Sequence, residues 1–259
     1  MSVQCSFSKG LEGRVALVTG ASGGLGRHFA MVLAAHGARV ALAARRVDRL
    51  TEVQREIARA GGQAAAIAMD VSDAASVASG FDAAARSLGP VDVVVNNAGV
   101  VSEGRCVDTS EHTWHHVIEV NLNGVFRVAR EAARRKSDRG AGGAIVNIAS
   151  ILGLGVLKGL APYATTKAAV IQLTKAMALE LARDRVRVNA LAPGYFSTEL
   201  NETFLAGSSG RRLVSRIPMR RIGVLDELDA PLLLLCSDAG AFMTGSVVTV
   251  DGGHAMAMG

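Results

Sequence analysis

The sequence predicts an α/β fold: a Rossmann-like, doubly wound parallel sheet of about seven strands with helices on both faces. Two observations predict it. Apolar runs of strand length alternate with helical patterns, and no linker, repeat or low-complexity block interrupts them. The 259 residues are 49% hydrophobic but only 4% aromatic, so Ala, Val, Leu and Ile build the core, as in parallel strands covered on both faces. We therefore expect a single domain over residues 1–259.

Seven short apolar runs are predicted to be strands because turn-forming glycine, proline or polar residues bound them. The segments between them have apolar residues on one face, which is typical of helices that cover a sheet. Gly124 lowers the stability of the longest helix, so we expect a kink or close packing there. The strands are expected at residues 14–19, 39–43, 63–68, 91–95, 144–149, 185–191 and 247–250, and the helices at 27–36, 50–60, 76–88, 110–135, 162–182 and 226–236.

Two segments fall outside this alternation. Residues 1–10 precede the first strand, lack the apolar core of a signal peptide, and are expected to be a flexible N-terminus. Residues 195–222 hold a Gly-Ser-Ser-Gly stretch and five arginines, and they form the least regular part of the chain. We expect the second segment to be a substrate lid over the crevice at the carboxyl ends of the strands.

Charge and cysteine content exclude several classes of partner. The net charge of +5, with scattered arginines, is too small to indicate nucleic-acid binding and fits a cationic pocket for an anionic ligand. No apolar run approaches the roughly 20 residues that cross a bilayer, so no membrane partner is expected. Cys5, Cys106 and Cys236 lack disulfide or metal-site spacing, which favours a reduced, cytoplasmic protein.

A glycine-rich turn lies between the first predicted strand and the first helix. Glycines let the backbone approach a pyrophosphate, and the helix N-terminus supplies unpaired N–H groups. The spacing is not GxGxxG, because Phe29 stands where that pattern has Gly or Ala. An ordinary glycine loop is the alternative, but the flanking strand and helix favour a dinucleotide site. Its predicted residues are Gly20, Ser22, Gly24, Leu25 and Gly26.

The end of the second predicted strand indicates which dinucleotide is bound. NAD sites usually have an acid about 20 residues beyond the glycines, which holds the ribose 2′-OH. Counting from Gly24 reaches Ala44, and Arg45 and Arg46 follow at once. A guanidinium pairs with a 2′-phosphate, whereas an acid repels it. Two solvated arginines at a helix start are the alternative. We expect NADP(H) rather than NAD(H), with Arg45 as the phosphate ligand because it lies nearest the strand end.

Polar and small residues follow the third and fourth predicted strands. Asp70, beside Val71, could accept a hydrogen bond from an adenine amino group, or it could simply order a loop. Small and amide residues after the fourth strand could approach a flat cofactor and tie neighbouring strands, although asparagine-rich turns are common. This run is Asn96-Asn97-Ala98-Gly99, of which Asn97, Ala98 and Gly99 are predicted cofactor residues.

The predicted reactive groups are concentrated in residues 147–167. Ser150 ends a buried strand, where its hydroxyl can donate to a carbonyl or alkoxide oxygen. Tyr163 and Lys167 are four residues apart, so they share one face of a helix that Pro162 can begin. An ammonium close to the phenol should lower the tyrosine pKa from its usual value near ~10. A surface pair without function is the alternative for this spacing alone.

The long helix at 110–135 carries two further groups of interest. Asn121 lies among apolar residues, and a buried amide needs partners, so it either ties backbone groups or orders a water. His112, His115 and His116 have the helical spacing of metal ligands. No Glu-flanked motif or partner cysteine supports zinc, and we expect no metal.

Taken in order, these motifs resemble those of the short-chain dehydrogenase/reductase family over about residues 11–253. A departure is Ser22-Gly23, because many NADP-preferring members have a basic residue inside the glycine turn. The matching motifs are Thr19-Gly20-x3-Gly24-x-Gly26, Asp70, Asn96-Asn97-Ala98-Gly99, Asn121, Ser150, Tyr163-x3-Lys167, and Pro193-Gly194 with Thr198.

The resemblance implies a role for each residue. Tyr163 would be the general acid in reduction and the base in oxidation, and Ser150 would hold the substrate oxygen. Lys167 would bind the nicotinamide ribose and lower the Tyr163 pKa, and Asn121 would hold a water linking Lys167 to solvent. Family members are commonly tetramers, which implies a homotetramer. The cofactor's nicotinamide end would be lined by Pro193, Gly194 and Thr198, with Thr198 at the carboxamide.

The expected activity is hydride transfer between NADP(H) and a ketone or secondary alcohol. Apolar residues within 152–160 either form a pocket wall or pack in the core, and a pocket wall would favour a hydrophobic small molecule, with 3-oxoacyl thioesters as one candidate. They are Leu152, Leu154, Val156, Leu157 and Leu160. An NAD-dependent alcohol dehydrogenase is the nearest alternative. An isomerase of sugar nucleotides would have a larger C-terminal domain, and a non-catalytic dinucleotide-binding regulator would usually lack the tyrosine or the lysine.

Overall fold

The computed structural model describes residues 10–197 and 207–258 and has one seven-stranded sheet. Its strand order is β3-β2-β1-β4-β5-β6-β7, and every neighbouring pair is parallel. The predicted doubly wound sheet is therefore confirmed. The strands are β1 (Val15–Thr19), β2 (Arg39–Ala44), β3 (Gln63–Ala68), β4 (Val93–Asn96), β5 (Gly143–Ile148), β6 (Val186–Pro193) and β7 (Val247–Val250).

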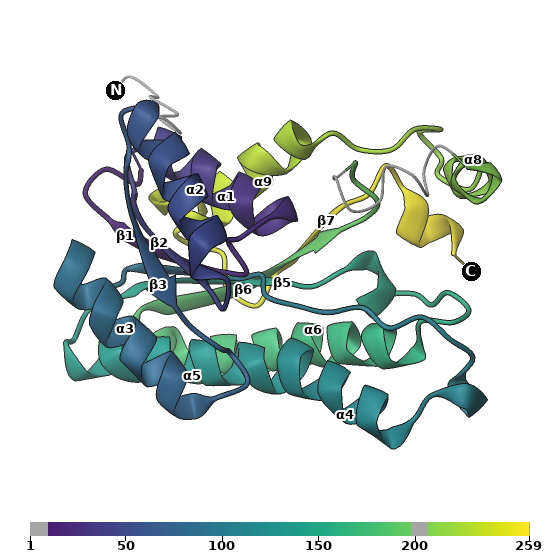
Figure 1. Ribbon diagram of the computed structural model, residues 1–259, viewed down its shortest axis with the longest axis horizontal. Helices are drawn as coiled ribbons and strands as arrows, with labels where there is room; N and C mark the ends of the chain where they lie inside the picture. The colour runs from purple at the N-terminus through teal and green to yellow at the C-terminus, as the bar shows by residue number, and fades with distance from the viewer. Residues whose placement is uncertain (1–9, 198–206, 259) are drawn as a thin grey trace.

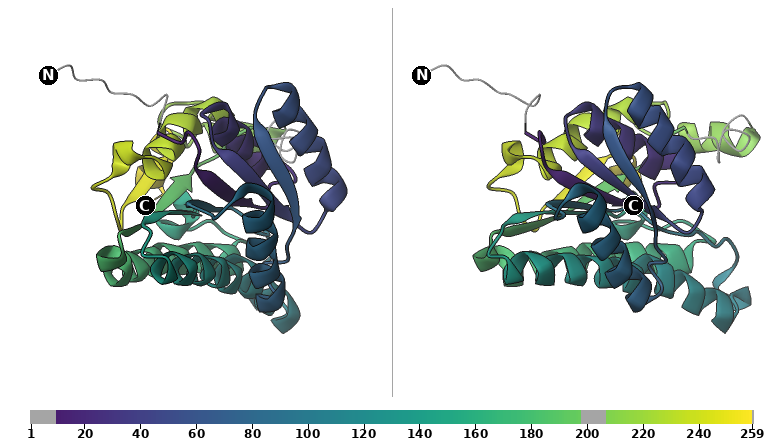
Figure 2. Two further views of the ribbon diagram at one scale, coloured as in Figure 1. Left: turned by 90° about the vertical axis from the view of Figure 1, so that its left-hand side faces the viewer. Right: turned by 60° about the vertical axis from the view of Figure 1, so that its left-hand side comes forward.

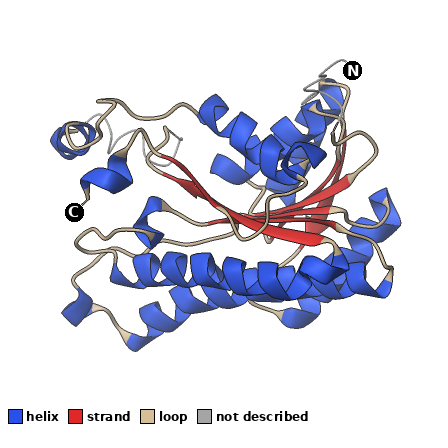
Figure 3. Cartoon of the chain, turned by 180° about the vertical axis from the view of Figure 1, so that it is seen from behind, coloured by secondary structure: helices blue, strands red, loops and turns tan. Residues whose placement is uncertain are grey.

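Helices cover both faces of the sheet, as Figures 1, 2 and 3 show. One layer holds α1 (Gly24–Ala35), α2 (Val47–Arg59) and α9 (Asp229–Cys236). The other holds α3 (Ala74–Leu88), α4 (Glu111–Ile118), α5 (Gly124–Asp138) and α6 (Ala161–Leu181), while α8 (Ser208–Val214) lies beyond the carboxyl end of the sheet. Within residues 10–197 and 207–258, every helix is either too short or too polar to cross a bilayer.

The core lies on both sides of the sheet because successive strand residues point to opposite faces. Ala16 and Val18 of β1 pack under the layer of α1 and α9, whereas Val15 and Leu17 pack under the layer of α3 and α5. All five residues of β1 are buried. This explains why the strand sequence is uniformly apolar rather than alternating.

The predicted long helix at 110–135 is interrupted at the position that Gly124 indicated. A π-helical turn, Glu119–Asn123, separates α4 from α5. A Cβ on Gly124 would lie 2.8 Å from Cγ2 of Val71, so the helix also packs closely against the end of β3. Such π turns are frequent at functional sites, and this one holds Asn121 in the protein interior.

The strand order places the functional site. The chain winds outward from β1 through β2 to β3, and then returns to place β4 on the other side of β1. In sheets of this kind, the loops that leave β1 and β4 diverge and open a crevice at the carboxyl ends of the strands. The glycine turn, Asn97 and Ser150 all follow strands at this edge.

Candidate active site

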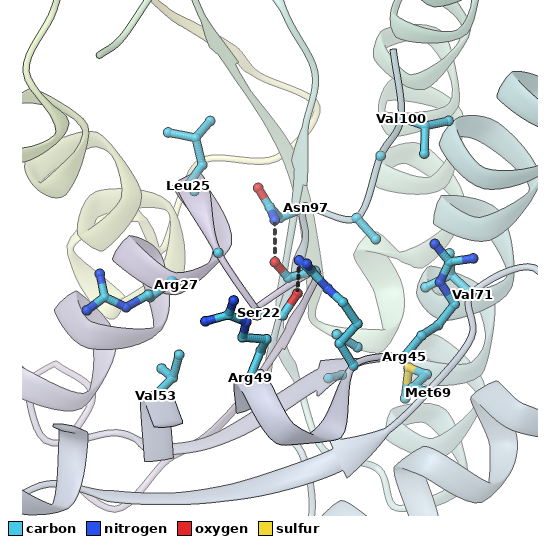
Figure 4. Close-up of a pocket in the computed structure, with 18 of the residues that line it drawn as sticks. Ser22, Leu25, Arg27, Arg45, Arg49, Val53, Met69, Val71, Asn97 and Val100 are labelled. Atoms are coloured by element: carbon cyan, nitrogen blue, oxygen red, sulfur yellow. Dashed lines mark hydrogen bonds between the residues drawn. The ribbon is translucent and has the colours of Figure 1, made fainter. Parts of the chain in front are cut away.

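A cleft with a volume of about 850 Å³ opens at the carboxyl ends of β1, β2 and β4 (Figure 4). Four other predicted cofactor residues, Gly26, Tyr163, Lys167 and Pro193, do not line it, and Thr198 lies outside the described residues. The structure thus brings most of the predicted cofactor residues together. Those that line the cleft are Gly20, Ser22, Gly24, Leu25, Arg45, Asp70, Val71, Asn97, Ala98, Gly99 and Gly194.

The glycine turn needs its glycines for two physical reasons. Gly20 and Gly24 have φ values of 67° and 52°, a left-handed backbone that other residues adopt at a cost. Gly26 instead makes room: a Cβ there would overlap the Gly20 carbonyl oxygen and lie 2.5 Å from Nδ2 of Asn97. The turn therefore folds back on itself and exposes its backbone to the cleft, which is the arrangement that fits a pyrophosphate.

Thr19 and Asn97 join β1 to β4 beneath this turn. The Thr19 hydroxyl oxygen accepts hydrogen bonds from the backbone N–H groups of Asn97 and Ala98, both at 3.0 Å. Nδ2 of Asn97 donates to the Thr19 carbonyl at 3.0 Å. The predicted tie between neighbouring strands is confirmed, and it fixes the floor of the cleft.

Arg45 and Arg46 both line the cleft, but they point to different parts of it. Nη2 of Arg46 donates to the Ser22 hydroxyl at 3.1 Å, so this guanidinium rests on the glycine turn. Arg45 extends toward Val71 (Figure 4). Because both arginines directly precede α2, only their side-chain directions distinguish them, and the sequence preference for Arg45 did not contain that information.

Asp70 is held as an ionised group at the end of β3. Its Oδ1 accepts hydrogen bonds from the Ser72 hydroxyl at 2.6 Å and from the Ser72 backbone N–H at 2.9 Å. The Ser72 hydroxyl is the largest influence that lowers the pKa of Asp70, and Arg45 and Arg127 lower it further against the effect of burial. Asp70 therefore orders its own loop and also presents a carboxylate to the cleft.

Ser150, Tyr163 and Lys167 meet at one end of α6. Lys167 is 4% exposed, and its Nζ lies 5.5 Å from the centre of the Tyr163 ring. The Ser150 hydroxyl lies close enough to the Tyr163 phenol to lower the pKa of Tyr163. Gly153 makes this approach possible, because a Cβ there would lie 2.7 Å from the backbone carbonyl carbon of Lys167. The turn Ile151–Gly153 thus rests directly on α6.

The electrostatics of this trio differ in one respect from the prediction. Burial raises the pKa of Tyr163, and the nearby Ser150 hydroxyl offsets this only in part. The expectation that Lys167 would lower this pKa is wrong for this arrangement, because Nζ donates to the Ile148 carbonyl at 2.7 Å and burial of the phenol dominates. Burial also lowers the pKa of Lys167 to about 8.

Asn121 connects the cofactor side of the cleft to the catalytic helix. Its Oδ1 accepts from the Val100 N–H at 2.7 Å, and its Nδ2 donates to the Val100 carbonyl at 2.8 Å and to the Thr166 hydroxyl at 3.3 Å. The first of the two expected roles, tying backbone groups, is confirmed. Its side-chain amide is engaged by these contacts, so the water relay stays a prediction.

Asn121→Ala should destabilise the fold by about 1–2 kcal/mol, since it leaves the half-buried N–H and carbonyl of Val100 without their side-chain partner. Urea unfolding followed by circular dichroism measures the change. Asn123→Ala is the control, because that amide on the same π turn bonds only to the Glu119 side chain. Equal stability of the Asn121 variant and the wild type would contradict the assigned contacts.

The substrate side of Tyr163 is mostly apolar. Leu152, Leu157 and Leu160 pack in one small cluster with Tyr163, as the predicted pocket wall requires. Leu154 and Val156 are exposed and lie outside that cluster. The sequence did not identify three further members, Tyr195, Ala255 and Met258, because they come from distant segments that carry no local signal of the contact.

Known proteins resemble this chain over nearly its whole length. The family model described as "Enoyl-(Acyl carrier protein) reductase" matches residues 20–255. Gluconate 5-dehydrogenase of Gluconobacter oxydans is 39% identical over 244 residues, which are 94% of this chain and 95% of that protein. 3beta-hydroxysteroid dehydrogenase 1 of Eggerthella lenta is 40% identical over 245 residues, which are 94% of each chain.

Solved structures agree in fold as well as in sequence. A gluconate 5-dehydrogenase from Burkholderia cenocepacia, in complex with NADP and tartrate, has a TM-score of 0.92 at 36% identity, with 97% of this chain and 99% of that chain covered. A short-chain type dehydrogenase/reductase from Mycobacterium marinum has a TM-score of 0.90 at 40% identity, with 96% and 98% covered. The chain therefore belongs to the short-chain dehydrogenase/reductase family and is an oxidoreductase that uses a nicotinamide dinucleotide.

Proposed function

We propose that the protein interconverts a ketone and a secondary alcohol, with Ser150, Tyr163 and Lys167 as its catalytic residues. The observation that carries this assignment is the close approach of the Ser150 hydroxyl and the Tyr163 phenol beside the buried Lys167 ammonium, where α6 meets the carboxyl end of β5. A nicotinamide dinucleotide, when bound, supplies or accepts the hydride. Asn121 supports the site by holding the Val100 backbone and the Thr166 hydroxyl of α6.

Residues of the chain stabilise the charge that develops on the substrate oxygen and deliver its proton. Two hydroxyl donors preplaced at one point can stabilise the negative charge that develops on a carbonyl oxygen during reduction. The raised pKa of Tyr163 keeps the phenol protonated at neutral pH, so it can deliver the proton as a general acid. Lys167, with a pKa of about 8, is mostly protonated at pH 7 and can restore that proton.

The chemistry of the cleft fits NADP(H) better than NAD(H). Arg45 and Arg46 line its adenine end, and β2 ends at Ala44 without the acid that an NAD site would present. The contact of Arg46 with Ser22 supports Arg46 as the principal 2′-phosphate ligand and Arg45 as a second one. The NADP named with the Burkholderia cenocepacia structure agrees with this proposal.

Arg46→Asp should lower the ratio of kcat/KM for NADP+ to that for NAD+ by about 10–100-fold, because a charge-assisted contact of ~1.5–3 kcal/mol is replaced by repulsion. Arg45→Asp should have a smaller effect. Steady-state rates with each cofactor measure both. Arg55→Asp makes the same charge change on α2 outside the cleft and serves as the control. An unchanged ratio in both cleft variants would place the phosphate elsewhere.

The remaining parts of the proposal concern the substrate and the assembly. The apolar wall supports a hydrophobic ketone or secondary alcohol.

We also propose one domain over 1–259 with a lid at 195–222, of which 198–206 lie outside the described residues, and a homotetramer in the cytoplasm. A panel of alcohols and ketones with NADP(H) and NAD(H) tests the activity, and light scattering on the purified protein tests the assembly. No turnover across the panel would favour a non-catalytic dinucleotide-binding regulator.

A further inference from the structure

The C-terminal turn of the chain closes the substrate end of the site. The Asp251 carboxylate fixes this turn by accepting hydrogen bonds from the N–H groups of Gly253 at 2.9 Å and Ala255 at 2.6 Å. A Cβ on Gly194 would lie 2.7 Å from Cβ of Asp251, so the turn also packs on the loop after β6. Since Ala255 joins the apolar cluster around Tyr163, the turn is a wall of the active site.

His254 lies on this turn with an unsatisfied side chain. It is 1% exposed, and its Nδ1 is buried without a hydrogen-bond partner. Buried polar atoms are nearly always paired, with protein, water or ligand, so an unpaired one calls for a partner. Burial lowers the pKa of His254, Asp251 raises it, and Arg216 lowers it again. The neutral imidazole can donate or accept a hydrogen bond.

Tyr195 connects His254 to the cleft. The two rings lie 5.8 Å apart at an interplanar angle of 42°. Tyr195 lines the cleft and belongs to the same cluster as Tyr163, and the Gly223 N–H donates to its backbone carbonyl at 3.0 Å. Burial and then the Glu103 carboxylate raise the pKa of Tyr195, so its hydroxyl stays protonated at neutral pH. The Tyr195 phenol therefore lies near the Tyr163 phenol, and the proposed hydride and proton transfers do not use it.

We propose that Tyr195 and His254 form a second polar contact for the substrate, and that they select an uncharged alcohol or ketone with a further hydroxyl near the reacting carbon. This inference rests on the proposed function. The Tyr195 hydroxyl touches the substrate, whereas His254 does not line the cleft and is a positioning residue that sets the Tyr195 ring. Its buried Nδ1 pairs with a water that is held behind Tyr195 when the substrate is bound. The leucines around them bind the apolar remainder.

The test compares matched alcohols with NADP+: cyclohexanol, 1,2-cyclohexanediol and 1,3-cyclohexanediol. The wild type should prefer at least one diol by about tenfold in kcat/KM, the value of one well-placed hydrogen bond. Tyr195→Phe removes a single oxygen and should bring the ratio near one. His254→Phe should reduce the ratio mainly through the KM of the diol, and His254→Asn, which keeps a polar atom near the position of Nδ1, should restore part of it.

His115→Asn, on the exposed face of α4, is the control and should keep the wild-type ratio. Equal kcat/KM for all three alcohols in the wild type, or a diol preference that survives Tyr195→Phe, overturns the inference and leaves the oxidoreductase assignment standing. No oxidation of any panel alcohol by the wild type contradicts the proposed function itself. Should His254→Phe fail to fold, Tyr195→Phe, which changes no buried packing, decides the question.

Discussion

Tyr163→Phe is expected to lower kcat by about 10³-fold, within the range of 10²–10⁴ for loss of a general acid–base group. The substitution removes one oxygen and leaves the ring in its packing beside Lys167 and Leu160. Affinity for the cofactor should therefore change little, since most of the cleft is formed by the glycine turn and by residues after β2, β3 and β4. Turnover of the best panel substrate and fluorescence titration of NADPH measure the two quantities separately.

The matched control for this variant is Ser150→Ala, which removes the other hydroxyl of the pair. It should lower kcat by about 10²–10³-fold, as loss of one preplaced oxyanion donor does. Because Tyr163 alone delivers the proton, the tyrosine variant should be at least as impaired. Ordinary turnover in Tyr163→Phe, or a loss that follows weaker NADPH binding, would refute the acid–base assignment.

The raised pKa of Tyr163 also predicts opposite pH profiles for the two directions. The phenol is protonated below its pKa, which burial holds above the usual value of 10. Reduction needs the protonated phenol, so the part of its kcat/KM that depends on Tyr163 should change little between pH 7 and 9. Oxidation, which needs the base form, should speed up as pH rises through that range. Profiles of kcat/KM in both directions check this, and an oxidation rate that falls with pH would contradict it.

The sequence predicted most of the fold because the signals for a parallel sheet are local. Each buried strand is a short apolar run, and the structure moves its bounds by only a few residues, as for β1 at Val15–Thr19 against the expected 14–19. The glycine turn was equally readable, since strand, glycines and helix are contiguous. Gly124 likewise marked a real irregularity: a π turn precedes it, and it packs closely against Val71.

The parts that were missed depend on side-chain direction or on contacts between distant segments. Arg45 and Arg46 are adjacent between β2 and α2, and only the structure shows that Arg46 reaches Ser22. Tyr195 and His254 are separated by α8, α9 and β7, so no periodicity could pair them. The pKa of Tyr163 was predicted in the wrong direction because spacing reports proximity to Lys167 but not the depth of burial.

Lys167→Met is expected to lower kcat by about 10²-fold or more and, at the same time, to stabilise the protein at pH 7. Burial lowers the pKa of Lys167 from 10.5 to about 8, so keeping the ammonium inside the fold costs roughly 3 kcal/mol at 1.36 kcal/mol per pKa unit. Methionine has a similar volume and no charge, but it leaves the Ile148 carbonyl without its donor. That unpaired carbonyl costs ~1–2 kcal/mol and offsets part of the gain. A net gain of about 1–2 kcal/mol should remain.

Lys136 offers the matched control. It is 1% exposed, burial lowers its pKa to about 8, and its Nζ donates to the carbonyls of Val91 and Asp92 at 3.0 and 2.7 Å, at the end of the sheet opposite the cleft. Lys136→Met should leave turnover intact, because no part of the active site contacts this lysine. It should not stabilise the protein as Lys167→Met does, since two carbonyls lose their donor rather than one.

The pH dependence of unfolding distinguishes the charge effect from packing. Both lysines have folded pKa values near 8 and unfolded values of 10.5, so between these pH values the unfolded chain binds more protons and stability rises with pH. Each lysine contributes up to 1.36 kcal/mol per pH unit, and each single Met variant should remove its share of the slope. Urea unfolding between pH 8 and 10 measures it. If the stability of the wild type does not rise over this range, the burial assigned to both ammonium groups is contradicted. If it rises normally but Lys167→Met keeps full activity, the buried charge is confirmed and Lys167 has no part in catalysis. We expect Lys167→Met to lose turnover and to gain stability, because a buried charge that serves catalysis destabilises the fold.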